Sequence, residues 1–132
     1  MDLVSRPGEG EVLSKSHRDL RIKALIPELN LCEYDVGPEY KGAGPHYHER
    51  HADAFYVLEG ELEFQVAGET VRAPAGTSVV PPGVVHAFTN PGLGRARFLN
   101  IHAPESGFIE YLRARDRGED VDPSEYDIFD VD

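Results

Sequence analysis

Polar and apolar residues alternate with a period of two along much of the chain. The run 61–66 alternates without a fault, and within 53–58 Asp53, Phe55 and Val57 fall on one face of the strand. Successive side chains of a strand point to opposite faces, so this alternation predicts strands with one buried face. Further strands are predicted over 20–25, 29–36, 70–72, 77–80, 84–89 and 95–102.

Turn residues separate these short segments. Thirteen glycines and ten prolines punctuate the chain, at Gly60, at Ala67-Gly68-Glu69 and at Gly76 among other positions. Short strands with turn signals between them favour an all-β sandwich or barrel. We therefore expect a β-barrel over 20–104, preceded by a polar arm over 1–19 that packs on a neighbouring subunit.

The pattern changes after Pro104. Apolar residues recur at helical spacing and predict a helix from Gly107 to about Arg115, with Ser106 as its N-cap. Asp122-Pro123-Ser124-Glu125 is typical of a second helix start. The segment 105–132 is thus predicted to be a helix followed by an acidic tail, and the tail's apolar residues Tyr126, Ile128 and Phe129 indicate that it docks on the barrel.

Composition narrows the possible partners. The 132 residues carry a net charge of −11, of which residues 116–132 contribute −7. Nucleic acid and anionic membranes are therefore poor partners, because both need a basic surface. We find no apolar run of about 18 residues and no signal-peptide pattern. The single cysteine, Cys32, favours a cytoplasmic setting and is interpreted as a small buried strand residue.

Three histidines stand out as candidate metal ligands. His46 and His48 are one residue apart, and on a strand residues i and i+2 point to the same side. His86 follows Pro81-Pro82-Gly83 far downstream. Neutral imidazole is a common ligand of transition metals, so a third histidine and a carboxylate brought in from elsewhere would complete a site.

The spacing of these residues resembles the two sequence motifs of the cupin superfamily. His46-x-His48 is followed by Asp53 and Gly60, and Gly76 is followed by Pro81-x-Gly83-x-x-His86-x-x-x-Asn90. Three positions depart from the motifs. Tyr40 stands where glycine is expected, one residue is missing between Gly76 and Pro81, and Asp53 replaces a glutamate. The resemblance covers about residues 37–103 and implies a double-stranded β-helix, or jelly-roll barrel, with a short C-terminal helical segment.

By this resemblance His46, His48 and His86 hold a divalent metal, which could be Fe, Mn, Ni, Cu or Zn. Asp53 is one methylene shorter than glutamate, so its carboxylate falls about 1.5 Å short. It ligates the metal directly if the strand shifts. Alternatively, a water completes a three-histidine site, or His51 swings in as an extra ligand. A barrel without metal, whose histidines are hydrogen-bonded or bind an organic ligand, stays open as an interpretation.

Alternation also predicts which residues line the pocket. Phe55 and Val57 share the face of Asp53, and Phe88 shares the face of His86. On the last strand Asn100 and His102 lie on one face with Phe98, while Leu99 and Ile101 lie on the other, and the sequence does not choose which face is internal. No arginine is assigned to an inward face, which favours a small, largely apolar substrate.

Two classes of function follow from the resemblance. One is a metal-dependent enzyme on a small molecule, either dioxygenase-like or an isomerase or lyase. The other is a non-catalytic module that binds a metal or a ligand. An open coordination position would distinguish them. Small cupins commonly pair, and exposed sheet edges need covering, so we also expect a homodimer.

Overall fold

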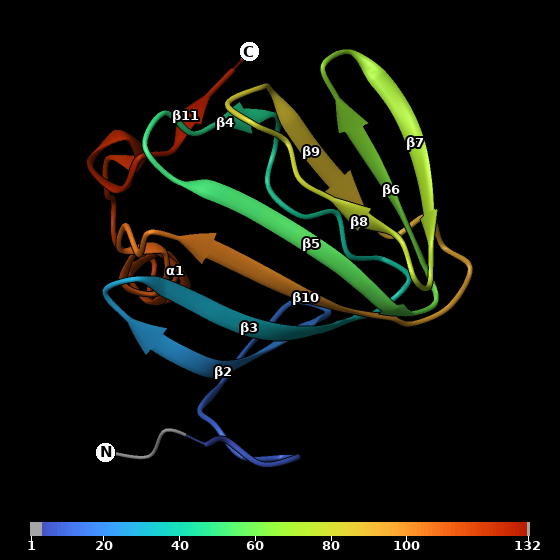
Figure 1. Cartoon of the computed structure of the whole chain (residues 1–132), viewed down its shortest axis with the longest axis horizontal. Helices are drawn as coiled ribbons and strands as arrows, with labels where there is room; N and C mark the ends of the chain where they lie inside the picture. Colours follow the sequence, from blue (N-terminus) through green and yellow to red (C-terminus); the bar gives the residue numbers. More distant parts are fainter. Residues whose placement is uncertain (1–3, 132) are drawn as a thin grey trace.

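Two antiparallel sheets face each other in the computed structural model, which describes residues 4–131 (Figure 1). The larger sheet has the order β1-β2-β3-β10-β5-β8. Its strands are β1 (Val12–Lys15), β2 (Arg18–Ile26), β3 (Leu29–Val36), β10 (Ala96–Ala103), β5 (Ala52–Glu59) and β8 (Ser78–Val79). The smaller sheet has the order β11-β4-β9-β6-β7. Its strands are β11 (Phe129–Asp130), β4 (His46–Tyr47), β9 (His86–Thr89), β6 (Glu61–Val66) and β7 (Glu69–Pro74).

This arrangement confirms the predicted jelly-roll fold, and most predicted strands are present with ends that differ by one or two residues. The chain passes from the larger sheet to the smaller one at Gly60, between β5 and β6. Gly60 has a φ of 75°, and a Cβ atom there would lie 2.5 Å from the carbonyl oxygen of Arg95. Only glycine combines this left-handed conformation with so close an approach of two backbone segments.

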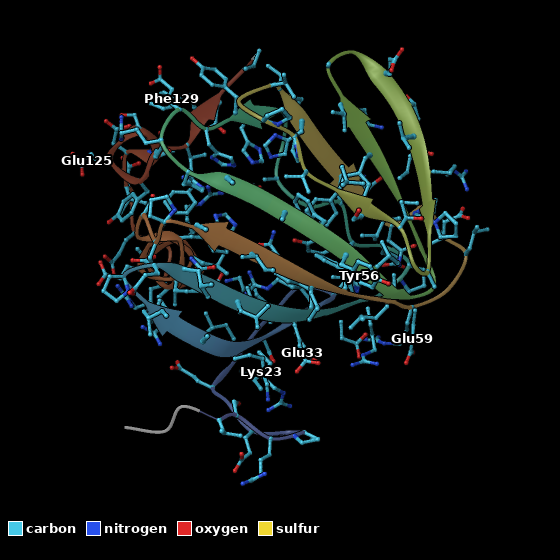
Figure 2. All side chains as sticks on the ribbon, in the orientation of Figure 1. Lys23, Glu33, Tyr56, Glu59, Glu125 and Phe129 are labelled. Carbon is cyan, nitrogen blue, oxygen red and sulfur yellow. The ribbon has the colours of Figure 1, made fainter. Side chains whose placement is uncertain are left out.

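The core fills the space between the two sheets. Phe55 of β5 meets Phe64 of β6 with ring centroids 5.0 Å apart, and Phe88 of β9 meets Phe98 of β10 at 5.3 Å. These aromatic pairs join opposite sheets, and all but the half-buried Phe88 belong to the buried cluster. Outward residues of the larger sheet, among them Lys23, Glu33 and Tyr56, point away from this core (Figure 2). The predicted inward and outward faces of β5 and β6 are thus confirmed.

The sequence left open which face of β10 points into the barrel, and the two neighbouring strands decide it. Asn100 lies opposite Cys32 of β3 and Phe55 of β5, whose side chains are both buried. Asn100 and His102 therefore point inward and are 2% and 3% exposed. Leu99 and Ile101 occupy the outer face, where they are half-buried. Two polar side chains are in this way placed inside the barrel.

The segment before β2 is more regular than its polar sequence suggests. Residues 12–15 form β1, which pairs with β2 of the same chain. The backbone carbonyls of Arg6 and Glu9 accept hydrogen bonds from Lys23 Nζ, and those of Gly8 and Gly10 accept from Arg21 Nη1. Residues 6–15 thus pack along β2. Positions 1–3 of the predicted arm lie outside the described residues.

The C-terminal segment closes one end of the barrel. Helix α1 (Phe108–Asp116) lies beside the ends of β10 and β3 (Figure 1). The predicted N-cap is wrong: Gly107 occupies that position without a side-chain cap, and Ser106 Oγ donates instead to the carbonyl of Pro104. The second predicted helix start is confirmed as the 3-10 helix η1 (Pro123–Tyr126), capped by Asp122. None of the helices within residues 4–131 has the length and apolar character needed to cross a bilayer.

The acidic tail docks as predicted. Ile128 is buried, and β11 pairs with β4, so that Phe129 lies opposite Tyr47 and their rings stack 5.2 Å apart. Tyr47 therefore faces the tail, while its neighbours His46 and His48 face the barrel interior. The tail thereby contacts the strand that carries the histidine pair.

Candidate metal centre

Four predicted residues come together at one end of the barrel interior. One possible ligand atom from each of His46, His48, Asp53 and His86 lies within 4.8 Å of the others. His46 of β4 is the direct cross-strand partner of His86 of β9, and Asp53 reaches them from β5 in the opposite sheet. The group thus spans both sheets, and three of its members are buried while His46 is half-buried.

Backbone carbonyls hold the three imidazole rings in one tautomer. Nδ1 of His46 lies 2.8 Å from the oxygen of Gly44, Nδ1 of His48 lies 2.8 Å from that of Asp127, and Nδ1 of His86 lies 3.0 Å from that of Val84. A carbonyl oxygen only accepts hydrogen bonds, so each Nδ1 carries the ring proton. In the neutral ring Nε2 then offers a lone pair, the form in which histidine ligates a metal.

The Nε2 atoms of His48 and His86 lie 3.2 Å and 3.1 Å from Oδ2 of Asp53. Lone pairs on both sides of such a short contact repel unless a cation lies among them. A proton on each Nε2 would remove this repulsion, and so would one divalent ion bound by all the ligand atoms. Nitrogen and carboxylate donors suit Fe(II), Mn, Ni, Cu and Zn alike. The side chains present therefore fit a divalent metal, and this group could hold one.

The charge of Asp53 is stabilised by its surroundings. Burial alone would raise the pKa of its carboxyl, but the charges and hydrogen bonds of His102, His48 and His86 outweigh burial and hold the pKa well below its usual value. Asn100 Nδ2 also donates to Oδ1 at 2.6 Å. Burial lowers the pKa of His46 and lowers that of His102 to about 4, so both rings are neutral at neutral pH. Burial also opposes the charge of His48, but its hydrogen bonds to Asp53 and Asp127 outweigh burial and raise its pKa. The site therefore combines two neutral rings, His46 and His102, with an ionised carboxylate.

His51 lies beside this group without belonging to it. Its Nδ1 bonds to Oδ2 of Asp127 at 2.8 Å, and its Nε2 lies 2.9 Å from Nδ1 of His102. Nε2 of His102 in turn lies 2.9 Å from the amide oxygen of Asn100, and the amide nitrogen of Asn100 donates to Asp53. A line of close polar contacts therefore runs from the carboxylate of Asp127 to that of Asp53, and both nitrogens of His51 belong to it.

Sequence reasoning missed Asp127. This tail residue is 1% exposed, and its carboxylate accepts hydrogen bonds from the backbone N–H groups of Glu49 and Arg50 and from His51. Its carbonyl also orients His48. The available signal was an acid flanked by the apolar residues Tyr126 and Ile128, in a tail already expected to dock. The tail thus supports the loop that joins His48 to Asp53.

A cavity of about 650 Å³ opens next to the histidines. Phe55, Phe88, Asn100 and His102 line it as predicted, while Val57 is fully buried in the core instead. His46, His48 and Asp53 face the same space. The cavity therefore gives a small molecule access to the ligand group, and its volume lies in the range of small-molecule sites.

Arg18 is one of several charged cavity residues that depart from the expected apolar lining. Strand β2 begins at Arg18, two residues before the predicted start, and Arg18 continues the inward row of Leu20. Its guanidinium lines the cavity. The expectation that no arginine faces inward is therefore wrong, because the strand extends into a segment whose composition is polar.

Comparison with known proteins agrees with the fold. The chain is 27% identical to quercetin 2,3-dioxygenase of Bacillus subtilis (strain 168) over an alignment 122 residues long, which covers 80% of this chain but only 36% of that protein. The structure of KdgF from Halomonas sp. superposes with a TM-score of 0.69 at 23% identity, covering 79% of this chain and 94% of that one. An RmlC-like cupin from Shewanella frigidimarina NCIMB 400 gives a TM-score of 0.68 at 22% identity, covering 79% and 92%.

The family described as "Cupin domain" matches residues 32–102, which include every residue of the histidine and aspartate group. This match covers more than half of the sequence. With the two facing sheets and the structural neighbours, it shows that the chain belongs to the cupin family.

Proposed function

We propose that this cupin holds a divalent transition metal through His46, His48, His86 and Asp53, and that it is a metal-dependent enzyme acting on a small organic molecule. The observation that carries the proposal is the tautomer that the three rings share. Each Nδ1 is held by a backbone carbonyl, and the Nε2 atoms of His48 and His86 meet a buried carboxylate.

The adjoining cavity favours catalysis over a purely structural metal. A structural site is closed by protein ligands, whereas a catalytic site keeps a position open to the substrate. His46, His48 and Asp53 line a cavity of about 650 Å³. A metal there would act as a Lewis acid on a substrate oxygen or support reaction with O2, which corresponds to isomerase or lyase chemistry and to dioxygenase chemistry respectively.

The protein's own side chains would bind and orient the substrate. Phe55 and Phe88 offer apolar ring surface, and Asn100 and His102 offer polar groups beside Asp53. Asn100 and His102 contact the carboxylate rather than the predicted ligand nitrogens, so they hold Asp53 in position. Similarity to quercetin 2,3-dioxygenase supports the dioxygenase-like alternative, although the chain spans only about a third of that protein.

Metal content tests the first half of this proposal. We expect about one transition-metal ion per chain of purified protein by elemental analysis, and loss of that ion in His86→Ala with the barrel still folded. The matched control is His17→Ala, because His17 has a half-exposed side chain outside the site. Equal metal content in wild type and His86→Ala would rule out the proposed ligands.

Activity tests the second half. The protein reloaded separately with Fe(II) and Mn is assayed against aromatic, flavonoid-like and oxo-acid compounds, with oxygen uptake and product formation followed together. Turnover that His86→Ala abolishes supports an enzyme. A metal-loaded protein that turns over none of these compounds favours the second candidate, a non-catalytic module that binds a metal or a ligand, which the tautomer-locked histidines support equally well.

We further propose that two copies of the chain pair. We also propose that the chain has three parts, namely an N-terminal arm of residues 1–19, the barrel of 20–104 and a C-terminal segment of 105–132. The larger sheet ends at β1 and the smaller at β7, where Val71 is exposed. Such edges need covering. Light scattering tests this, and a monomer at micromolar concentration would contradict it. The cytoplasmic location inferred from the single Cys32 stays a prediction.

A further inference from the structure

We propose that the cavity end remote from the metal ligands is a carboxylate-binding subsite built around Arg18, so that the ligand of this cupin is an organic acid with an apolar body. This inference rests on the proposed function, because it names the substrate class of that same cavity. Arg18, Tyr34 and Tyr40 form this Arg18 subsite.

The guanidinium of Arg18 is buried with unused hydrogen-bonding capacity. The residue is 7% exposed, and its Nη2 donates to Oδ2 of Asp116 at 2.6 Å, while its Nε has no partner. A buried donor without an acceptor is unfavourable, because it has given up its hydrogen bond to water without replacing it. The edge of the guanidinium that carries Nε is suited to an oxyanion, since arginine binds carboxylates through two of its N–H groups.

Two phenols accompany this charge. Tyr34 and Tyr40 line the cavity, and neither hydroxyl is among the hydrogen bonds within residues 4–131. Burial raises the pKa of Tyr34 well above its usual value, and both Arg18 and Asp53 act on the charge of that hydroxyl. In the sheet Tyr34 lies opposite Leu20, one inward row from Arg18 toward the metal ligands. Neutral phenols donate hydrogen bonds, which an incoming anion can accept.

The sheet register separates the two ends of the cavity. On the larger sheet Arg18 lies opposite Val36, the next inward row holds Leu20, Tyr34, Phe98 and Val57, and the row after it holds Asn100 and Phe55. Asp53 belongs to the following row, opposite His102. Arg18 and Asp53 are thus three inward rows apart within one cavity. A ligand that reaches both needs an extended body, and the space between them is lined by aromatic rings.

The charge balance also favours an anion. Three cationic and three anionic side chains line the cavity, namely Lys15, Arg18 and Arg115 against Asp53, Asp116 and Asp130. These charges cancel, so a bound divalent ion would leave the cavity at +2. Arg18 already shares its charge with Asp116. This sharing favours a singly charged carboxylate over a dianionic phosphate.

Asp116 acts in this scheme as an internal counterion that the ligand can replace. It is the last residue of α1, where the helix dipole disfavours a carboxylate. Lys15 Nζ donates to the backbone carbonyl of Asp116, and the side chain of Asp116 is 23% exposed. The contact with Arg18 therefore links the helix to the subsite without filling it. A purely structural ion pair would give no reason for the buried Nε of Arg18 to lack a partner.

The test measures binding of 4-phenylbutyrate, its neutral amide 4-phenylbutyramide and phenyl phosphate by calorimetry to the full chain. Each titration is run on the metal-loaded protein and on protein treated with EDTA. We expect the carboxylate to bind at least about 10-fold more tightly than the amide or the phosphate in both forms. Equal binding of carboxylate and amide, or tighter binding of phosphate, would overturn the carboxylate subsite.

Two variants with opposite expected effects separate binding from structure. Arg18→Gln should weaken carboxylate binding about 10-fold or more and leave amide binding unchanged. Asp116→Asn should strengthen carboxylate binding several-fold, because it removes the competing anion. A structural role for the ion pair would make both variants weaken all three probes, which would refute the inference. Arg97→Gln, on the outer face, is the matched control.

Failure of this inference is distinguishable from failure of the proposed function. A protein without metal that still binds 4-phenylbutyrate through Arg18 keeps the subsite and loses the metal site. A protein with bound metal whose carboxylate affinity is the same in wild type and Arg18→Gln keeps the metal site and loses the subsite.

Discussion

The tail residue Asp127 should stabilise both the fold and the metal site, and Asp127→Asn tests this. Its carboxylate accepts N–H groups of Glu49, Arg50 and His51 at 3.0, 2.7 and 2.8 Å. An asparagine has one acceptor oxygen and turns its NH2 toward the remaining donors, so at least one buried N–H loses its partner. Asp127 has a φ of 59°, which asparagine tolerates, so the change isolates the carboxylate from backbone strain.

The expected loss is about 2–3 kcal/mol, from one unsatisfied buried donor and the loss of charge on the remaining hydrogen bonds. For a chain of this size that corresponds to a fall in Tm of roughly 6–12 °C. Metal affinity should fall about 10- to 100-fold, because the loop that carries His48 loses support. Differential scanning calorimetry measures the first effect, and competition with a chromophoric chelator measures the second.

The matched control is Asp120→Asn, which makes the same charge change at an exposed position of the same segment. It should leave both quantities unchanged. The reasoning would be refuted if Asp127→Asn melted within about 1 °C of the wild type and bound metal equally well. A lower Tm with unchanged metal affinity would show that the tail supports the fold but not the histidine group.

Three further outcomes follow from the structure. Gly60→Ala should lower the free energy of unfolding in urea by at least about 2 kcal/mol, because its Cβ would meet the carbonyl of Arg95. The control Gly68→Ala, with open space around its Cβ, should lower it by about half as much or less. Burial raises the pKa of the Cys32 thiol from 9.0 to about 12, so iodoacetamide should label it at pH 8 only after unfolding. The thiol holds its proton more tightly when folded, and its contribution to stability is therefore complete below pH 9 and lost as the pH rises toward 12. Removal of the proposed metal with EDTA should lower the Tm of the wild type and leave that of His86→Ala unchanged; equal shifts in both would contradict the site.

Local pattern was sufficient for much of the fold. In residues 61–66 polar and apolar side chains alternate strictly, so only one face can enter a core, and Leu62 and Phe64 are indeed fully buried. The spacing of His46 and His48 placed these two rings on one side of a strand, and the resemblance to the cupin motifs implied that His86 joins them. Such features depend on neighbours within a few residues, where the geometry of a strand is nearly constant.

Other features depend on partners far away in the chain. Leu99 and Ile101 are as apolar as Phe98, so the inward face of β10 followed only from its register with β3 and β5. Ser106 is a good capping residue, yet the backbone turns at Gly107 and leaves it outside the helix. These outcomes are set by pairing across the sheet and by the path of the chain, which no short window contains.

The sequence by itself therefore determined the strand pattern and an all-β fold, since these follow from period-two alternation and turn residues, and its resemblance to the cupin motifs predicted the jelly-roll barrel and the residues of the histidine group. Only the tertiary structure decided that Arg18 faces the cavity and that Asp127 holds the loop after His48. Arg18 meets Asp116 across 98 residues, and Asp127 meets Glu49 across 78. From the sequence alone, a charged residue is predicted to be exposed to solvent, because burying a charge is favourable only when a partner is present. Whether such a partner lies nearby depends on the tertiary structure.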